Sequence, residues 1–151
     1  MPKTNDLHIT YNRTSKELEQ LYHAYARHAG VSDAALWLLY IIRLGGNNLT
    51  QAAICADWHY PPQTINSALK RLEAQGLVAL APATGSRRDK AVHLTAEGEK
   101  TVEHVIDPLI DAERAALADL APKERTALVS LSQRYLGLLG ERLGTLEGGA
   151  R

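Results

Sequence analysis

Apolar and polar positions repeat at helical spacing in the middle of the chain, in the segment QTINSALKRLEAQ that follows Pro61 and Pro62. At about 100° per residue, its apolar side chains fall on one stripe. The stripe consists of Ile65, Ala68, Leu69 and Leu72. Proline suits a helix start because its φ is fixed and it has no N–H, and Gly76 suits the left-handed position past a helix end. The pattern predicts a helix from Pro62 to Gln75 with one buried face.

The opposite stripe of this helix carries amides, a hydroxyl and cations instead of the Glu and Lys pairs that are usual on exposed helices. These groups can donate to or accept from base edges and phosphates. The stripe consists of Gln63, Asn66, Ser67 and Lys70, flanked by Thr64 and Arg71. We interpret it as a surface that contacts a polar partner.

A shorter helix precedes this one and is joined to it by a tight turn. Thr50 is a suitable N-cap for QAAICADW, in which Ile54 and Trp58 are four residues apart and can pack on the apolar stripe. His59 lies where the chain must turn through positive φ, which His tolerates better than most residues. Two helices joined by three or four residues form a helix-turn-helix, whose second helix reads DNA.

Two short strands, over 77–83 and 91–95, follow the second helix and enclose the turn TGSRRDK. β-rich runs on either side of a glycine-containing turn predict a hairpin. Its tip carries the cations Arg87, Arg88 and Lys90. Cations at a hairpin tip are most often simply solvated, but beside a DNA-reading helix they predict a wing that reaches the phosphate backbone or the minor groove.

Further helices are predicted on both sides of this core, with residues 1–12 as an arm. The run Thr14 to Glu17 fits a capping box and opens a helix over 14–30. Its apolar stripe consists of Leu18, Leu21, Tyr22, Tyr25 and Ala26. Ser32 can cap a nearly all-apolar helix over 33–43, which we expect to be buried. Thr95 and Pro122 open helices over about 96–120 and 123–146, and Pro108 should kink the first.

The last two helices carry more leucine and valine than a small winged domain can cover. A two-fold dimer places paired recognition helices in successive major grooves about 34 Å apart. We therefore predict a homodimer built by helices 14–30 and 96–146. The alternative, a self-contained helical monomer, would leave much leucine exposed.

The segment from Leu49 to Gly98 resembles the winged helix-turn-helix core of the MarR family of bacterial transcriptional regulators. That family's pattern is LTxxxLA, a turn, SxxTVxxxLxxLExxGLV, a wing with Asp-x-Arg, and LTxxG. The matching positions are Leu49, Thr50, Ile54, Thr64, Ile65, Leu69, Leu72, Glu73, Gly76, Leu77, Val78, Arg88, Leu94, Thr95 and Gly98. The order of the flanking helices also fits, so the resemblance extends over nearly the whole chain after about residue 12.

Three positions depart from the family pattern. Pro61 stands where the family has a serine N-cap, and His59 stands where it has a turn glycine. Ser86 replaces the wing aspartate, which removes one partner of the ion pair that commonly braces the family's wing. We therefore expect Arg88 to be held less firmly than in its relatives.

The resemblance also implies a small aromatic or phenolic effector, bound between the dimerisation helices and the winged core. Four aromatic residues are candidates to line such a site: Tyr22, Tyr25, Trp37 and Tyr40. Their alternative role is to fill the core.

The composition limits the remaining classes. The 151 residues carry 17 cations and 17 carboxylates, but residues 63–93 hold five cations against two carboxylates, whereas residues 94–147 hold six against ten. Positive charge is thus concentrated on the predicted DNA surface. No signal peptide is visible, and the longest apolar run, 34–42, is far below the roughly 20 residues that span a bilayer. A single cysteine suits the cytoplasm.

Enzyme and metal chemistry find little support. No nucleophile and base share a recognisable motif, and no phosphate loop or paired-Cys motif is present. Glu103, His104 and Asp107 lie within one turn, and His23 and His28 are five apart, spacings at which a metal could bind. Histidines beside acids on a helix surface are usually just solvated, so we predict no metal site and no cofactor. Cys55 lies at a close helix contact, where a redox-active thiol would be poorly exposed.

We therefore predict one mainly α protomer with a small β-hairpin wing, in which a winged helix-turn-helix over 32–95 is flanked by the dimerisation helices. The expected function is that of a cytoplasmic homodimeric regulator, a repressor, that binds a pseudo-palindromic double-stranded DNA operator. Gln63, Asn66, Ser67 and Lys70 would read bases, Thr64 and Arg71 would hold phosphates, and Arg87, Arg88 and Lys90 would carry the wing. The alternatives are a winged-helix module that binds protein and a metal-sensing regulator of the same fold.

Overall fold

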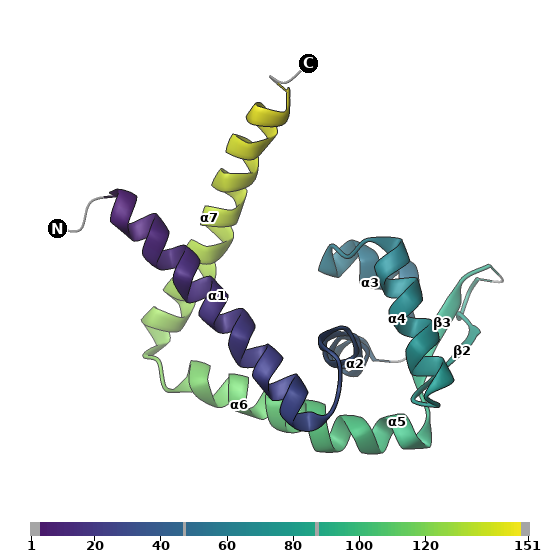
Figure 1. The fold of residues 1–151 in the computed structure, drawn as a ribbon. Coiled ribbons are helices and arrows are strands. Elements are labelled where there is room, and N and C mark those ends of the chain that lie inside the picture. Colours follow the sequence, from purple (N-terminus) through teal and green to yellow (C-terminus); the bar gives the residue numbers. More distant parts are fainter. Residues whose placement is uncertain (1–3, 47, 87, 149–151) are drawn as a thin grey trace. The chain divides into compact units, whose positions relative to one another are not determined.

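The structure is a computed structural model that describes residues 4–46, 48–86 and 88–148 (Figure 1). The chain divides into two compact units, residues 1–108 and 109–151, which are described separately. The predicted fold class is confirmed, since most described residues are helical and the strands form one small antiparallel sheet.

Helix α1 (Thr4–Ala29) begins well before the predicted start at Thr14. The prediction of an arm over 1–12 is therefore wrong from Thr4 onward, and residues 1–3 lie outside the described part of the chain. Thr14 is an interior residue of the helix, where its hydroxyl donates to the carbonyl of Thr10 at 3.0 Å. A threonine hydroxyl can donate to a backbone carbonyl of the preceding turn as well as cap a helix. The capping-box pattern at Thr14 therefore does not determine where α1 begins.

Helix α2 (Asp33–Gly45) is the centre of the core. As predicted, the Ser32 hydroxyl caps it by accepting from the N–H of Ala35 at 3.1 Å. Five of its apolar side chains are buried: Leu36, Leu38, Leu39, Ile41 and Ile42. Helix α1 contacts α2, and Ala26 near the C-terminal end of α1 is fully buried. Leu18 and Leu21 of the same predicted stripe are exposed.

The helix-turn-helix consists of α3 (Gln51–Trp58) and α4 (Pro62–Ala74). Thr50 caps α3, and His59 turns the chain with φ 54°, both as predicted. Gly76 ends α4 with φ 71°, a conformation that favours glycine. The predicted hairpin is formed by β2 (Val78–Pro82) and β3 (Lys90–Leu94), paired from Val78 with Leu94 to Pro82 with Lys90. The two-residue strand β1 (Leu49–Thr50), which the sequence did not predict, pairs with β3 and gives the order β1-β3-β2.

The predicted helix over 96–120 is interrupted. It consists of α5 (Ala96–Thr101), a π-helical turn η1 (Val102–Ile106) and α6 (Asp107–Ala118). The N–H of Asp107 donates to the carbonyl of Val102, five residues back. Pro108 follows at once, has no N–H, and its ring would clash with the carbonyl four residues earlier, so a wider turn here relieves the helix.

The second unit contains most of α6 and the long helix α7 (Pro122–Gly148). Pro122 opens α7 as predicted, and the Glu124 carboxylate accepts from the N–H of Ala121 at 2.8 Å. Most of the leucines of α7 are exposed, with Leu131 61% and Leu136 63% accessible. No described helix is long and apolar enough to cross a membrane.

Candidate nucleic-acid interface

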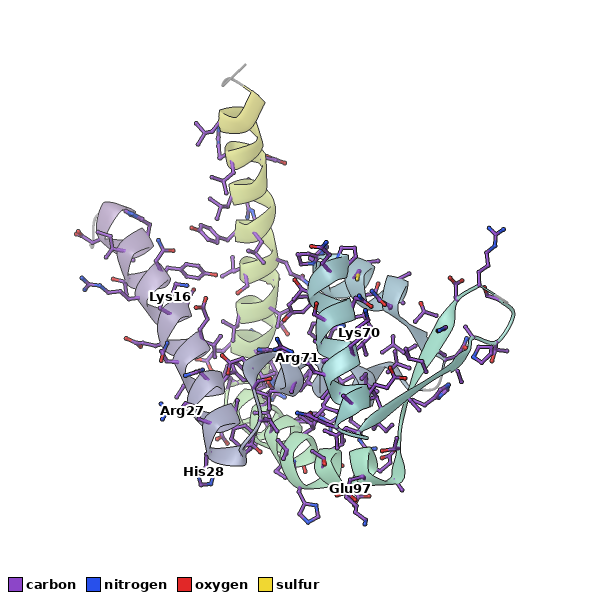
Figure 2. The ribbon with its side chains drawn as sticks, turned by 45° about the vertical axis from the view of Figure 1, so that its right-hand side comes forward. Lys16, Arg27, His28, Lys70, Arg71 and Glu97 are labelled. Atoms are coloured by element: carbon purple, nitrogen blue, oxygen red, sulfur yellow. The ribbon has the colours of Figure 1, made fainter. Side chains whose placement is uncertain are left out.

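Helix α4 presents its predicted polar face to solvent. Pro61 and Pro62 start the helix, while Ile65, Leu69 and Leu72 anchor it with at most 3% of their surface exposed. All six polar candidates on this helix are exposed: Gln63, Thr64, Asn66, Ser67, Lys70 and Arg71. Figure 2 shows Lys70 and Arg71 on this helix.

The polar face divides between two grooves. Asn66 and Lys70 line a groove of about 630 Å³ between α4, the start of α3 and the wing, which we call the α4–wing groove. Thr64, Ser67 and Arg71 line another, of about 510 Å³, whose opposite wall is the α1–α2 loop and the start of α2. Gln63 lies on the exposed first turn. The six residues predicted as one surface therefore form an exposed ridge with a hollow on each side.

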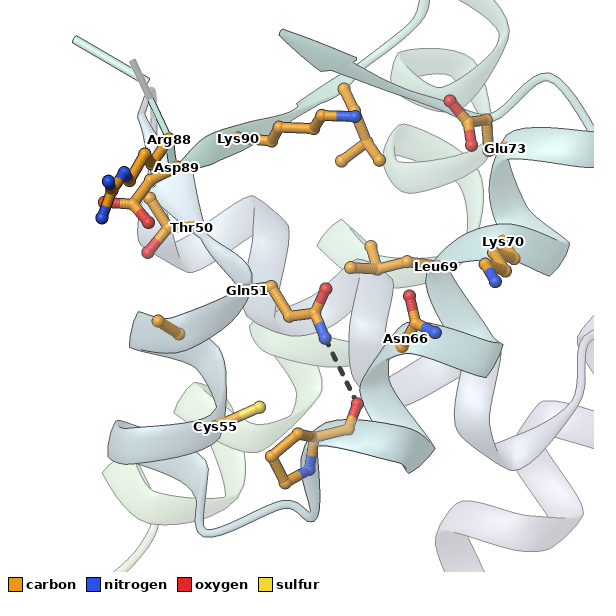
Figure 3. A pocket seen from close by; sticks show the side chains of 13 residues that line it. Thr50, Gln51, Cys55, Asn66, Leu69, Lys70, Glu73, Arg88, Asp89 and Lys90 are labelled. Atoms are coloured by element: carbon orange, nitrogen blue, oxygen red, sulfur yellow. Dashed lines mark hydrogen bonds between the residues drawn. The ribbon is translucent and has the colours of Figure 1, made fainter. Parts of the chain in front are cut away.

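The α4–wing groove brings helix and wing residues together, as Figure 3 shows. Arg88 and Lys90 of the wing and Lys70 of α4 all line it. Two carboxylates, Glu73 and Asp89, also line it. The sequence shows these acids within residues 63–93 but does not predict that they lie at the interface. The groove is thus mixed in charge, with an excess of cations among its described residues.

Gln51 holds the two helices of the helix-turn-helix together at one end of this groove. Its side-chain amide donates to the carbonyl of Pro62 at 3.2 Å (Figure 3). Pro62 is the first residue of α4, so this contact fixes where the helix begins relative to α3. Sequence reasoning missed Gln51, because the periodicity of α3 assigns it only to an exposed first turn.

The wing is braced by uncharged hydrogen bonds. The Asn48 side-chain oxygen accepts from the N–H of Thr84 at 2.6 Å, and Asn48 itself has φ 74°. The Ser86 hydroxyl accepts from the N–H groups of Arg88 and Asp89 at 3.3 and 3.1 Å. Ser86 thus closes a local turn at the position where related wings use an aspartate. Arg87, a predicted wing cation, lies outside the described residues.

The predicted ligand-binding aromatics separate into two groups. Tyr22, Trp37 and Tyr40 form a continuous row with ring centroids 4.7 and 5.6 Å apart, and Trp58 extends it from Tyr40 at 6.1 Å. Tyr25 is engaged elsewhere, since its hydroxyl donates to the carbonyl of Val105 at 2.6 Å. Its placement in the ligand site remains a prediction.

Three of the residues considered for metal binding, His23, His104 and Asp107, contact other partners. The imidazole of His104 lies 2.7 Å from the carbonyl of Lys100, and His23 contacts Asp33 at 2.8 Å. The Arg43 guanidinium donates two hydrogen bonds of 2.6 and 2.9 Å to the Asp107 carboxylate. These bonds raise the pKa of Arg43, although partial desolvation acts in the opposite direction. Within the described ranges, no three His, Cys, Asp or Glu side chains form a group that could hold a metal ion.

Cys55 is more accessible than predicted. It is half-buried and lines the α4–wing groove (Figure 3). Ala52 and Pro62 line the same groove.

Comparison with known proteins agrees with this geometry. Residues 29–89 match the model of the MarR family, a range that contains α2, the helix-turn-helix and β2. The winged helix-turn-helix of this chain is a MarR-family domain. The HTH-type transcriptional regulator PecS of Dickeya dadantii is 34% identical over 71 residues, which are 47% of this chain and 43% of PecS. The chain therefore aligns with less than half of the length of that relative.

Solved structures extend the likeness beyond the MarR-family domain. A MarR regulator of Oenococcus oeni is 16% identical with a TM-score of 0.73, over 87% of this chain and 99% of that one. MepR of S. aureus in a DNA complex is 20% identical with a TM-score of 0.68, over 87% and 96%. BpsR of Bordetella bronchiseptica is 21% identical with a TM-score of 0.61, over 83% and 98%. At these identities the likeness concerns the fold.

Proposed function

We propose that this chain is a sequence-specific DNA-binding transcriptional regulator that acts as a homodimer on a pseudo-palindromic operator. The observation that carries the proposal is the exposed polar ridge of α4, with the cationic wing across one groove. A helix that buries only its apolar stripe and presents amides, hydroxyls and cations is suited to the major groove.

Each part of this surface has its own task. Gln63, Asn66, Ser67 and Lys70 read base edges, while Thr64 and Arg71 hold phosphates. The wing cations Arg87, Arg88 and Lys90 follow the backbone or enter the minor groove. MepR, which has the same fold, has been solved in complex with DNA.

A second copy of this chain supplies the other half of the DNA surface. The exposed leucines of α7 include Leu128, Leu131, Leu136 and Leu146, each at least half accessible. The exposed apolar residues Leu7 and Leu21 of α1 also lack a covering element in the described part of this chain. In a two-fold dimer, the exposed apolar residues of α1 and α7 in one protomer would be buried against those of its partner.

An effector adjusts this activity. BpsR, again of the same fold, is described as having its DNA binding regulated by 6-hydroxynicotinic acid. Here the aromatic row of Tyr22, Trp37 and Tyr40 belongs to α1 and α2, and α2 packs directly on the recognition helix α4. A ligand that binds better to a dimer whose recognition helices are wrongly spaced for DNA would release the DNA. On this proposal the protein is a cytoplasmic repressor that its ligand inactivates.

The test is a titration of the purified chain against DNA from upstream of its own gene at two salt concentrations, together with its mass in solution. The proposal expects a dimer whose affinity falls steeply as salt rises, and a much weaker affinity for scrambled DNA of equal length. A monomer with no salt-dependent affinity for DNA would overturn it and would favour a protein-binding role for α4.

A further inference from the structure

A groove of about 460 Å³ lies between α1 and α2 and shares no lining residue with the two grooves beside α4. We call it the α1–α2 groove. Aromatic rings form part of its wall, since Tyr22 and Trp37 line it with centroids 4.7 Å apart. Leu18, which is 53% exposed, adds apolar surface, and the buried Leu36 lies beneath the groove lining. The groove therefore offers a small ligand aromatic and apolar surface.

The charged residues that line this groove are acidic. Glu19 and Asp33 both line it, and His23 contacts the Asp33 carboxylate through Nδ1 at 2.8 Å. Because a carboxylate only accepts, the hydrogen sits on Nδ1, and the neutral tautomer is enough to make this bond.

No lysine or arginine lines the α1–α2 groove among the described residues. Lys16 pairs with Glu19 at 2.8 Å, but the side chains of this pair are 76% and 63% exposed. Such a solvated pair is weak and is readily exchanged. The charge that a ligand meets in the groove is therefore negative.

We propose that the α1–α2 groove binds a small organic cation with an aromatic or alkyl body. The cation would lie over the faces of Tyr22 and Trp37, where the ring quadrupole attracts positive charge, with Asp33 and Glu19 as counter-charges. A carboxylate or phenolate would instead meet two like charges. This assignment rests on the proposed effector role of the aromatic row, but it gives the effector the opposite charge to a phenolate.

The experiment uses Trp37 as a reporter. The chain has two tryptophans, so Trp58→Phe leaves Trp37 as the sole one while keeping an aromatic ring beside Tyr40. Tryptophan emission of this variant is titrated with benzyltrimethylammonium, with benzyl alcohol as the neutral probe and phenylacetate as the anionic one. We expect saturable binding of the cation, and about tenfold weaker binding of the anion.

Charge-removing variants locate the site. Asp33→Asn and Glu19→Gln should each weaken cation binding about threefold, as expected for partly exposed charges. Glu17→Gln is the matched control, because Glu17 is an exposed carboxylate of the same helix that does not line the groove. Circular dichroism verifies that each variant is folded.

Two results would overturn the assignment: phenylacetate binding as well as the cation, or no saturable emission change with any of the three probes. Equal affinities in Asp33→Asn, Glu19→Gln and Glu17→Gln would also contradict it. The readout needs no DNA. A chain that binds the cation but no DNA would therefore refute the proposed regulator while leaving the ligand class intact, and the reverse outcome would refute the ligand class alone.

Discussion

Helices α4 and α7 both carry several large apolar residues but differ in what covers them. In α4, Ile65, Leu69 and Leu72 are at most 3% exposed, whereas in α7 Leu131 and Leu136 are more than 60% exposed. The apolar side of α4 is covered by other elements of the same chain, so its polar side is the one that a partner can contact. Helix α7 leaves its apolar side uncovered. The difference supports the proposal that the two helices meet different partners, DNA at α4 and a second protomer at α7.

Removing the buried side of α4 should have the largest effect on stability. Leu72→Ala deletes a side chain that is 1% exposed, and we expect it to lower the free energy of unfolding by about 2–5 kcal/mol. Urea denaturation monitored by circular dichroism measures this loss. Leu131 of α7 is 61% exposed, so Leu131→Ala should cost the monomer much less stability. An equally large loss in free energy of unfolding, measured at a protein concentration low enough to dissociate a dimer, would contradict the difference between α4 and α7.

Adding charge to the uncovered side of α7 tests the second half of the comparison. Leu131→Glu should dissociate the dimer, because two-fold symmetry places the carboxylate in the interface twice. Sedimentation should find a folded monomer with operator affinity reduced at least tenfold, since half of the DNA contacts are lost. Gln133→Glu adds the same charge at an exposed polar position of α7 and should leave the mass unchanged.

A change on the polar ridge of α4 should alter which sequence is bound. Asn66→Ala removes an amide that can pair with one base, and we expect a loss of about 1–3 kcal/mol of discrimination at a single base pair of each half-site. Competition among operators mutated one position at a time measures it. A uniform loss over all positions would mean that Asn66 holds the backbone instead of reading a base.

A change in the wing should weaken binding without changing preference. Arg88→Ala removes an exposed cation of the α4–wing groove, so affinity for many sequences should fall alike. The slope of log affinity against log salt should become shallower by about one per protomer. An unchanged slope would place Arg88 away from the phosphates.

The smallest expected effect concerns the brace of the wing. Asn48→Gly keeps a residue that tolerates the positive φ of this position but deletes the oxygen that accepts from Thr84. We expect a loss of about 0.5–1.5 kcal/mol, seen as faster hydrogen exchange at the Thr84 amide. Asn48→Asp keeps an acceptor and should retain the protection. Equal exchange in both variants would mean that this hydrogen bond does not hold the wing.

The elements with strong periodicity could be predicted from sequence. The buried stripe of α4, its proline start, its glycine end and the αL residue His59 each follow from local chemistry, and the structure confirms all of them. The start of α1 could not be fixed, because a threonine within a helix and a threonine at its cap differ only in where the hydroxyl bonds.

The candidate site was predictable only in part. Exposure of the α4 residues follows from their helical phase, but the division of the ridge between two grooves depends on where α2 and the wing lie. Asn48 and Gln51 each act through one hydrogen bond to a distant backbone group, and Ser86 acts through two to neighbouring backbone groups. No periodicity marks such contacts, so only the folded structure reveals them. The roles of the predicted DNA-contacting residues stay predictions.

The turn closed by Ser86 has a practical consequence for physical measurements on this chain. The hydrogen bonds that hold the described part of the wing tip come from a hydroxyl and an amide, which carry no charge, so salt should screen them little. Ion release from the nucleic acid can then be read directly from the salt dependence, without a correction for refolding of the hairpin. In a wing braced by an ion pair, the same curve would mix both processes.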